Sequence, residues 1–183
     1  MLLNSAGPLV DDRVVVGTGE PWEIFFFASE VVAGARKGHF NDAHGSMAHV
    51  LRKLGLICVK AILLKRIGRW AEIAPRFVVA RRQGRACGAM LLKHALMPDG
   101  QHLLLIEYMA VAESARREGV GRMLVEYAKR RAPVEGAECY CTEASRGMQR
   151  LLKRAGFVRT HRSKELIVAG ERLSVPSRWQ WRA

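Results

Sequence analysis

Long apolar segments, a secretory signal and abundant cysteine are all missing from this sequence. Its longest apolar run, Leu54 to Leu64, is interrupted by Lys60 and is too short to cross a bilayer. The first twelve residues have no basic segment ahead of an apolar one, the pattern that marks a secretory signal. Four cysteines in 183 residues do not make a disulfide framework. We therefore expect a soluble, cytoplasmic protein with reduced cysteines and no membrane partner.

Acidic residues are scarce as well. The chain has 17 Asp and Glu against 30 Lys and Arg, which gives a formal net charge of +13. Such a charge attracts phosphorylated cofactors, nucleic acid and acidic surfaces, but it does not choose between them. The length is that of one ordinary domain and is enough to bury a real core. We expect residues 1–183 to form a single domain.

A metal site is not indicated by the cysteines and histidines. Cys139 and Cys141 share one face of a predicted strand, but no second close pair completes a set of ligands. His39, His44 and His49 are spaced by five, which scatters them around a helix. A structural zinc site needs four ligands, so we expect no metal and two buried free thiols.

Apolar periodicity predicts strands and helices in the first half of the chain. A short strand at 13–16 precedes a helix from about Pro21 to Arg36, although residues 24–28 are aromatic enough to form a strand instead. Apolar residues at helical spacing predict a second helix at 40–55. The period then changes to that of strands, and turn residues separate three of them into an antiparallel meander at 76–82, 86–96 and 102–111.

The apolar pattern in the second half of the chain predicts one parallel crossover and further strands. Ser145 is expected to cap a helix that Gly156 ends. A strand, a helix and a strand after a meander predict a mixed sheet. The tail is expected to cover the sheet edge with Trp179 and Trp181. The segments are a helix at 119–131, a strand at 138–143, a helix at 146–155, strands at 157–161 and 165–170, and the tail at 177–183.

The strand at 102–111 is apolar on both faces, which is typical of a central strand covered on both sides. Alternation assigns Leu103, Leu105, Met109 and Val111 to one face and Leu104, Ile106 and Ala110 to the other. Glu107 belongs by alternation to the Met109 face, where a carboxylate among apolar neighbours is costly unless it is paired or hydrated.

The helix that follows begins with two glycines and three nearby arginines. Unpaired N–H groups at a helix start bind anions, and Gly119 and Gly121 let the backbone approach the anion closely. Arg116, Arg117 and Arg122 add positive charge, so we interpret the segment as a pyrophosphate site. A plain tight loop is the alternative. A dinucleotide fingerprint needs a third glycine and an acid about twenty residues on, and the third glycine is absent.

Residues Arg116 to Gly121 resemble the R/Q-x-x-G-x-G/A signature of the GNAT acetyltransferases, which bind acetyl-coenzyme A. The preceding strand ends in EYMAV, and a helix, a strand, a helix and Gly156-Phe157 follow in the order of that family. The similarity covers about 76–161. Residues 1–75 would supply a first strand and two helices, and 162–183 the last strands and tail. The resemblance implies an α/β fold with a mixed central sheet, splayed for coenzyme A and flanked by helices.

The resemblance also implies which residues hold acetyl-coenzyme A. Backbone groups of Met109 and Val111 would bond its pantetheine arm. Ser145 stands where the family often has Asn, although helix capping also explains it. The full set of expected coenzyme-binding residues is Met109, Ala110, Val111, Arg116, Arg117, Glu118, Gly119, Val120, Gly121, Arg122 and Ser145.

The expected reaction is direct attack of an amine on the acetyl carbon. Glu107 is the candidate base, because family members often place Glu or His on this strand; a structural ion pair or a solvent-facing carboxylate is the alternative. The family frequently has a Tyr five residues before the Phe of its Gly-Phe, as the acid for the departing thiolate. Here that position is Leu152, which cannot give a proton.

The acceptor cannot be derived from these residues. A primary amine of a small molecule, a peptide or an aminoacyl-tRNA fits the resemblance, and a homodimer is a candidate assembly. The basic segments at 52–82 and 146–154 together carry more positive charge than coenzyme binding needs, which makes RNA a candidate partner. A coenzyme A-binding sensor or interaction module without catalysis is the alternative that Leu152 permits.

Overall fold

The structure is a computed structural model that describes residues 13–40, 48, 51–52, 54–57, 75–96, 100–133, 135–168 and 171–182. In chain order its elements are β1 (Val14–Thr18), α1 (Glu23–Arg36), β2 (Arg76–Arg82), β3 (Arg85–Leu96), β4 (His102–Val111), the 3-10 turn η1 (Glu113–Ala115), α3 (Val120–Lys129), β5 (Ala137–Cys141), α4 (Arg146–Arg154), β6 (Val158–His161), β7 (Lys164–Val168), β8 (Glu171–Val175) and β9 (Ser177–Trp181).

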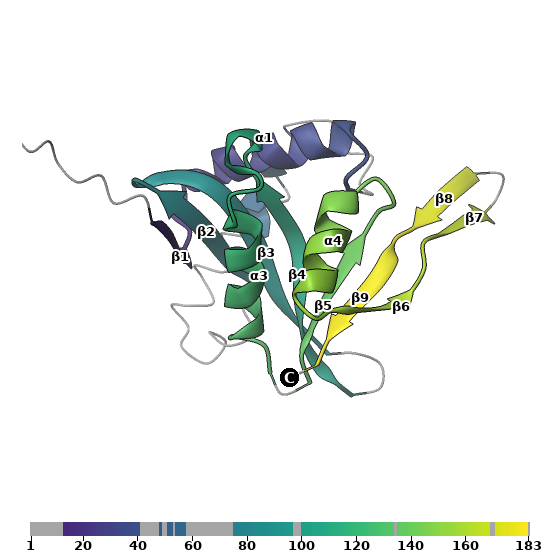
Figure 1. Ribbon diagram of the computed structural model, residues 1–183. Helices are drawn as coiled ribbons and strands as arrows, with labels where there is room; N and C mark the ends of the chain where they lie inside the picture. Colours follow the sequence, from purple (N-terminus) through teal and green to yellow (C-terminus); the bar gives the residue numbers. More distant parts are fainter. Residues whose placement is uncertain are drawn as a thin grey trace, which may run out of the picture.

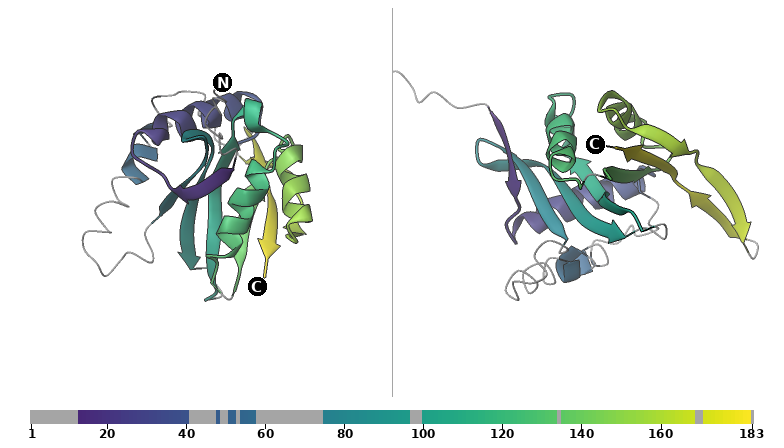
Figure 2. Two further views of the ribbon diagram at one scale, coloured as in Figure 1. Left: turned by 60° about the vertical axis from the view of Figure 1, so that its left-hand side comes forward. Right: turned by 90° about the horizontal axis from the view of Figure 1, so that it is seen from below.

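A seven-stranded mixed sheet forms the centre of the molecule, in the order β1-β2-β3-β4-β5-β9-β6. Only β4 and β5 pair in parallel, and every other neighbouring pair is antiparallel. Helix α1 covers one face, while α3 and α4 cover the other (Figures 1 and 2). Strands β7 and β8 form a separate two-stranded hairpin that extends away from the sheet (Figure 1). The mixed sheet with one parallel crossover is therefore confirmed.

Each helix presents one apolar stripe to the sheet. On α1 the buried residues Phe27, Ala28, Val31 and Val32 follow helical spacing and pack toward β2 and β3. On α3 the corresponding stripe is Val120, Leu124, Val125 and Ala128. Residues 24–28 are therefore helical and do not form a strand. None of the helices in the described ranges is long and apolar enough to cross a membrane.

Turn residues behave largely as expected. Gln83 and Gly84 join β2 to β3 with φ values of 51° and 74°, as a two-residue hairpin turn with two left-handed positions requires. Gly156 has φ 85° and follows the end of α4. Of the expected second helix at 40–55, residues 48, 51–52 and 54–55 are helical, as are residues 56–57 beyond it, whereas Phe40 is not. The other residues of that helix and the turn at 97–99 lie outside the described residues.

The C-terminal tail differs from its expected place. It forms β9, which lies between β5 and β6 and pairs with both, so it belongs to the sheet and does not cover the edge. Trp179 is 6% exposed and packs in the core under α3 and α4. Ser177 is buried on the same strand and donates a hydrogen bond to the Cys141 carbonyl at 2.9 Å. The alternation of small and aromatic residues thus fits a buried strand.

Candidate functional site

The two parallel strands at the centre of the sheet separate part of the way along. Pairing joins Leu104 to Ala137, Leu105 to Glu138 and Ile106 to Cys139, and it ends there. Both strands continue beyond these pairs, β4 to Val111 and β5 to Cys141. The sheet therefore opens into a V, and the edge of β4 that faces β5 has no strand partner there. This is the splay that the sequence resemblance implies.

A β-bulge in β4 lies where the V opens. On β3, Leu91 pairs with Tyr108 and the next residue, Leu92, pairs with Ile106, so Glu107 has no partner. An extra residue of this kind bends and twists its strand. The bulge therefore helps to turn the second half of β4 away from β5.

The same bulge corrects the expected assignment of faces in β4. Leu104, Ile106, Met109 and Val111 pack on the side of α3 and α4, while Ala110 packs on the side of α1. Strict alternation placed Ile106 with Ala110, which is wrong, because one extra residue inverts the alternation beyond it. The argument that Glu107 must share the Met109 face fails for the same reason.

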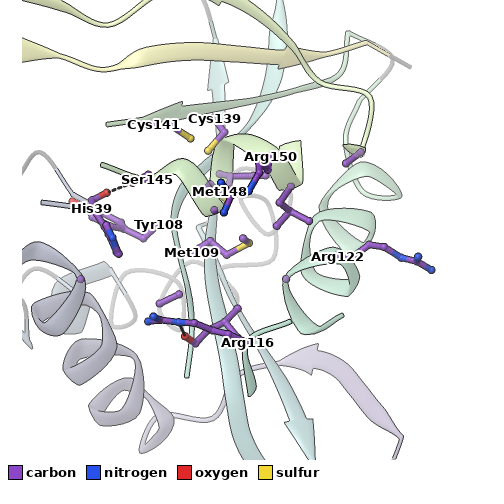
Figure 3. Close-up of a pocket in the computed structure, with 18 of the residues that line it drawn as sticks. His39, Tyr108, Met109, Arg116, Arg122, Cys139, Cys141, Ser145, Met148 and Arg150 are labelled. Atoms are coloured by element: carbon purple, nitrogen blue, oxygen red, sulfur yellow. Dashed lines mark hydrogen bonds between the residues drawn. The ribbon is translucent and has the colours of Figure 1, made fainter. Parts of the chain in front are cut away.

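A cavity of about 770 Å³ occupies the V and the space in front of it (Figure 3). Its walls come from the end of β4, the loop before α3, the first turn of α3, β5, α4 and the loop after α1. Most residues singled out in the sequence line this cavity. They are Glu107, Met109, Ala110, Val111, Arg116, Arg117, Gly119, Gly121, Arg122 and Ser145.

The first turn of α3 has the geometry of an anion cradle. Gly119 is the N-cap residue, with φ 84° in the left-handed region, and no side chain caps the helix. Met123 N–H is bonded to the Gly119 carbonyl at 3.0 Å, so the N–H groups ahead of it have no partner one turn back. A Cβ at Gly121 would lie 3.0 Å from Leu151 Cδ2. Glycine thus keeps the space in front of these N–H groups open.

Two predicted residues, Glu118 and Val120, do not line the cavity. The Glu118 carboxylate forms an ion pair with Arg82 of β2. Val120 is 1% exposed and packs against Gly88, where an added Cβ would lie 2.8 Å from Val120 Cγ1. These side chains fix the loop and the helix to the sheet, so only their backbones remain available to a ligand.

Positive charge reaches the cavity from the loop before α3 and from helix α4. Arg116 Nε donates a hydrogen bond to the Val111 carbonyl at 3.2 Å and so holds the loop against the end of β4. Arg122 projects away from the other labelled residues, whereas Arg150 of α4 lies beside Met148 (Figure 3). Arg150 and Arg154 both line the cavity. The two arginines are four residues apart, so they lie on one face of α4. This shared face could have been recognised from the sequence.

Ser145 does not cap α4 with its side chain, contrary to expectation. Its hydroxyl donates to the His39 carbonyl at 2.8 Å and lies 2.9 Å from the Thr142 hydroxyl oxygen. Thr142 in turn donates to the Gly38 carbonyl at 2.8 Å. The two hydroxyls therefore tie the segment between β5 and α4 to the loop after α1. A nonlocal tie of this kind leaves no signal in the sequence.

The loop after α1 brings His39 and Phe40 to the cavity. The rings of Phe40 and Tyr108 are 5.8 Å apart between centroids. Burial lowers the pKa of His39, and the positive charges of Arg116 and Lys37 lower it further. The imidazole is therefore neutral at neutral pH. Sequence reasoning placed His39 in a helix and missed it, because nothing near it in the chain indicates a site.

One thiol and the phenol on β5 are held in their neutral forms. Cys139 and Cys141 are buried free thiols, and a hydrogen bond with Cys141 together with burial raises the pKa of Cys139 well above its usual value. Burial and a hydrogen bond to Glu138 raise the pKa of Tyr140 to about 12. Cys139, Tyr140 and Cys141 line the cavity and Glu138 does not, and its raised pKa keeps the Cys139 thiol from acting as a nucleophile.

The resemblance expects an acid for the departing thiolate at position 152, but the residue there cannot give a proton. Leu152 is fully buried in the core between α4 and the sheet. The Glu107 carboxylate has no hydrogen bond or ion pair to any residue of the described ranges. Glu107 is half-buried and lines the cavity, so solvent or a ligand is left to solvate its carboxylate.

The sequence model of the acetyltransferase (GNAT) family matches residues 55–157, which is more than half of the chain. No curated protein matches the sequence. Solved structures with a similar fold include a ribosomal-protein-alanine N-acetyltransferase from Brucella melitensis. It is 15% identical with a TM-score of 0.66, and the match covers 92% of this chain and 99% of that one.

Two similar structures were solved with acetyl-coenzyme A. One is a GNAT superfamily phosphinothricin acetyltransferase from Sinorhizobium meliloti, 13% identical with a TM-score of 0.63, covering 92% of this chain and 88% of that one. The other is a putative acetyltransferase from Salmonella typhimurium, 11% identical with a TM-score of 0.65, covering 93% and 94%. At these identities the likeness shows the fold alone.

Proposed function

Because the chain belongs to the acetyltransferase (GNAT) family, we propose that it transfers acetyl from acetyl-coenzyme A to a primary amine by direct attack. One observation carries the proposal. The V between β4 and β5 opens beside a helix start whose first N–H groups have no backbone partner among the described residues, and one cavity joins the two. An elongated ligand with an anionic end and an amide-containing arm fits this combination.

The residues present suit coenzyme A. The open edge of β4 offers backbone groups to the two amides of pantetheine, with Met109 and Val111 as the proposed partners. The pyrophosphate would meet the N–H groups of the first turn of α3, with Gly119 and Gly121 leaving them accessible. Acetyl-coenzyme A then supplies the activated acetyl thioester at the opening of the V.

Glu107 is the proposed base for the acceptor. An alkyl amine with a pKa near ~10 is mostly protonated at neutral pH and must lose a proton before it can attack. Glu107 lies at the bulge and lines the cavity, and its carboxylate has no ion-pair partner in the described part of the chain. A carboxylate in that position attracts an ammonium group and accepts its proton.

The thiolate departs without a dedicated acid at Leu152, which is a core residue. A free thiol has a pKa of about 8.5, so its thiolate is a tolerable leaving group. Attack by a neutral amine is therefore sufficient to break the C–S bond. The acceptor would enter from the side of His39, Phe40 and Tyr108, where the cavity is aromatic.

Thiol release from acetyl-coenzyme A with a panel of amines tests the proposal. The panel holds small amines, a peptide with a free N-terminus, a lysine peptide and an aminoacyl-tRNA. We expect amine-dependent release with at least one class. Coenzyme binding without acetylation of any amine would instead indicate a non-catalytic coenzyme-binding module. The net charge of +13 is the reason to include the tRNA, and acetylation of that amine alone would favour an RNA-associated enzyme.

A further inference from the structure

The loop after α1 is fixed over the open end of the V. Thr142 and Ser145, which follow β5, donate to the carbonyls of Gly38 and His39, both at 2.8 Å. On the other side Phe40 packs against Tyr108 of β4. The loop therefore bridges the two strands at the point where they have separated.

The C-terminal end of α1 fixes the position of this loop. The N–H groups of Gly38 and His39 donate to the carbonyls of Ala35 and Gly34, each at 2.9 Å. A Cβ at Gly34 would lie 2.6 Å from Phe40 Cε2, so only glycine lets Phe40 pack this closely on α1. The position of His39 is thus determined by backbone and packing and does not depend on its own side chain.

The His39 imidazole lies among charged groups from three elements. Helix α1 and its end contribute Lys37 and Glu30, and Lys37 is paired with Glu113 at 3.3 Å. The loop before α3 contributes Arg116, and β4 contributes Glu107. The segment after β5 contributes only neutral hydroxyls. Burial and the cations lower the pKa of His39, so the neutral imidazole is present at neutral pH and is lost as pH falls through that lowered value.

We propose that His39 carries the reaction proton from the attacking amine to the coenzyme thiolate. This inference rests on the proposed function. The acceptor enters as an ammonium ion, and Glu107 takes its first proton. The neutral amine nitrogen forms a bond to the acetyl carbon, the C–S bond breaks, and the second proton passes to His39. The imidazolium then protonates the thiolate, and Glu107 releases its proton to solvent, which leaves free coenzyme A, an amide, a neutral His39 and Glu107 again as a carboxylate.

The proton affinities allow this sequence. A thiolate of pKa about 8.5 takes a proton from an imidazolium of pKa about 6.5 or lower without an energetic cost. The shuttle also explains how the enzyme works with Leu152 in the core, because the base of one step is the acid of the next. Glu107 and His39 then act on different protons, one from the β4 side and one from the loop after α1.

Steady-state kinetics of His39→Ala test the proposal, with the best amine of the panel and saturating acetyl-coenzyme A. We expect kcat to fall by ~10²–10⁴-fold, as loss of a general acid–base group does, and added free imidazole to restore part of it. In the parent, kcat/KM should fall on acidification through the His39 pKa, and the variant should lack this limb. The control is His161→Ala, an exposed residue of β6 outside the cavity, which should retain the parental rate and profile.

Calorimetry with acetyl-coenzyme A separates the inference from the function on which it rests. His39→Ala should bind the coenzyme like the parent. A variant with the parental rate and pH profile, or a slow one that imidazole does not rescue, overturns the shuttle and leaves the transferase intact. A parent that acetylates no amine overturns both. If His39→Ala fails to fold by circular dichroism, His39→Asn takes its place, with loss of the acidic limb as the deciding readout.

Discussion

Glu107 owes its position to a single backbone irregularity. It is the one residue of β4 without a partner on β3, and the same bulge bends the strand that borders the cavity. A regular strand at this place would pair with β5 over a longer stretch and leave less room in the V. The bulge therefore links the opening of the sheet to the presentation of a carboxylate inside it.

Glu107→Gln keeps the shape of the side chain and removes the base. The rate should fall by ~10²–10⁴-fold at neutral pH and recover in part as pH rises, because free amine then becomes available without the carboxylate. Steady-state kinetics across pH would measure this, with coenzyme affinity unchanged as the internal control. A parental rate at every pH would make Glu107 a structural carboxylate.

Residues of the site differ in how far the sequence predicts them. The roles of Gly119 and Gly121 can be predicted from local chemistry, because a helix that begins with glycines after an apolar strand is typical of an anion-binding site. Glu107 stood out as an acid in an apolar strand, although the bulge that presents it was not visible. His39 was not recognised, because Ser145 and Thr142 lie more than 100 residues away and tie its loop to the site only in the folded chain.

At the scale of elements, α3 lies close against β3 at Gly88. A Cβ there would lie 2.8 Å from Val120 Cγ1 and 3.2 Å from Leu124 Cδ1. Both side chains belong to the buried stripe of α3, so they have little space to move. The close approach helps to place the first turn of the helix beside the cavity.

Gly88→Ala should destabilise the fold by about 1–3 kcal/mol, the usual cost of overpacking a core. Urea unfolding followed by circular dichroism would measure the change. Gly147→Ala is the matched control, since nothing lies within 4 Å of its added Cβ and α4 should gain up to about 1 kcal/mol from the better helix former. Equal stability of parent and Gly88→Ala would show that α3 can shift away from the sheet.

Helix α4 carries four basic residues, of which two face the cavity. Arg150 and Arg154 line it, whereas Arg146 and Lys153 do not. Because of this placement we propose that part of the excess charge serves the coenzyme, where the sequence had suggested a polyanionic acceptor. The two pairs are close in sequence and equal in charge, so each serves as the control for the other.

Reversing both Arg150 and Arg154 to Glu should weaken acetyl-coenzyme A binding roughly tenfold or more, since a charged hydrogen bond contributes about 1.5–3 kcal/mol. Reversing both Arg146 and Lys153 changes the net charge equally and should have a much smaller effect that salt removes. Calorimetry at two salt concentrations would compare them. Equal losses in both variants would mean that only the long-range field matters.

The sequence predicts the helices and strands better than it predicts their neighbours in the sheet. The meander, α3 and α4 followed from apolar periodicity with turn residues between them, because these signals are local. The tail had the alternation of a strand, but β9 lies between β5 and β6, far from its neighbours in the chain. A short alternating segment of this kind can either cover the edge of a sheet or pair within the sheet. Tertiary contacts decide between these two outcomes.

On the scale of the whole molecule, charge and architecture point to the same ligand. The sheet opens at its centre, α3 and α4 border the opening on one face, and the loop after α1 lies at its outer end (Figures 1 and 3). Basic residues gather at the helices, and the net charge of +13 adds a long-range attraction for an anionic coenzyme. The part of the cavity lined by His39, Phe40, Tyr108 and Glu107 is the proposed entry for the acceptor.

Calorimetric titration of acetyl-coenzyme A into the parent and into Gly121→Glu tests the central claim most directly. The Cβ of a Glu at 121 would lie 3.0 Å from Leu151 Cδ2, 3.9 Å from Val111 Cγ2 and 4.0 Å from Met109 Cε, so it would bring a side chain and a negative charge to the cavity wall at the first turn of α3. The fold should survive, because an acidic residue in the first turn favours the helix dipole. We expect binding to the parent and no detectable binding to a folded Gly121→Glu. Equal affinity in the two proteins would contradict the assignment of this cavity to the coenzyme.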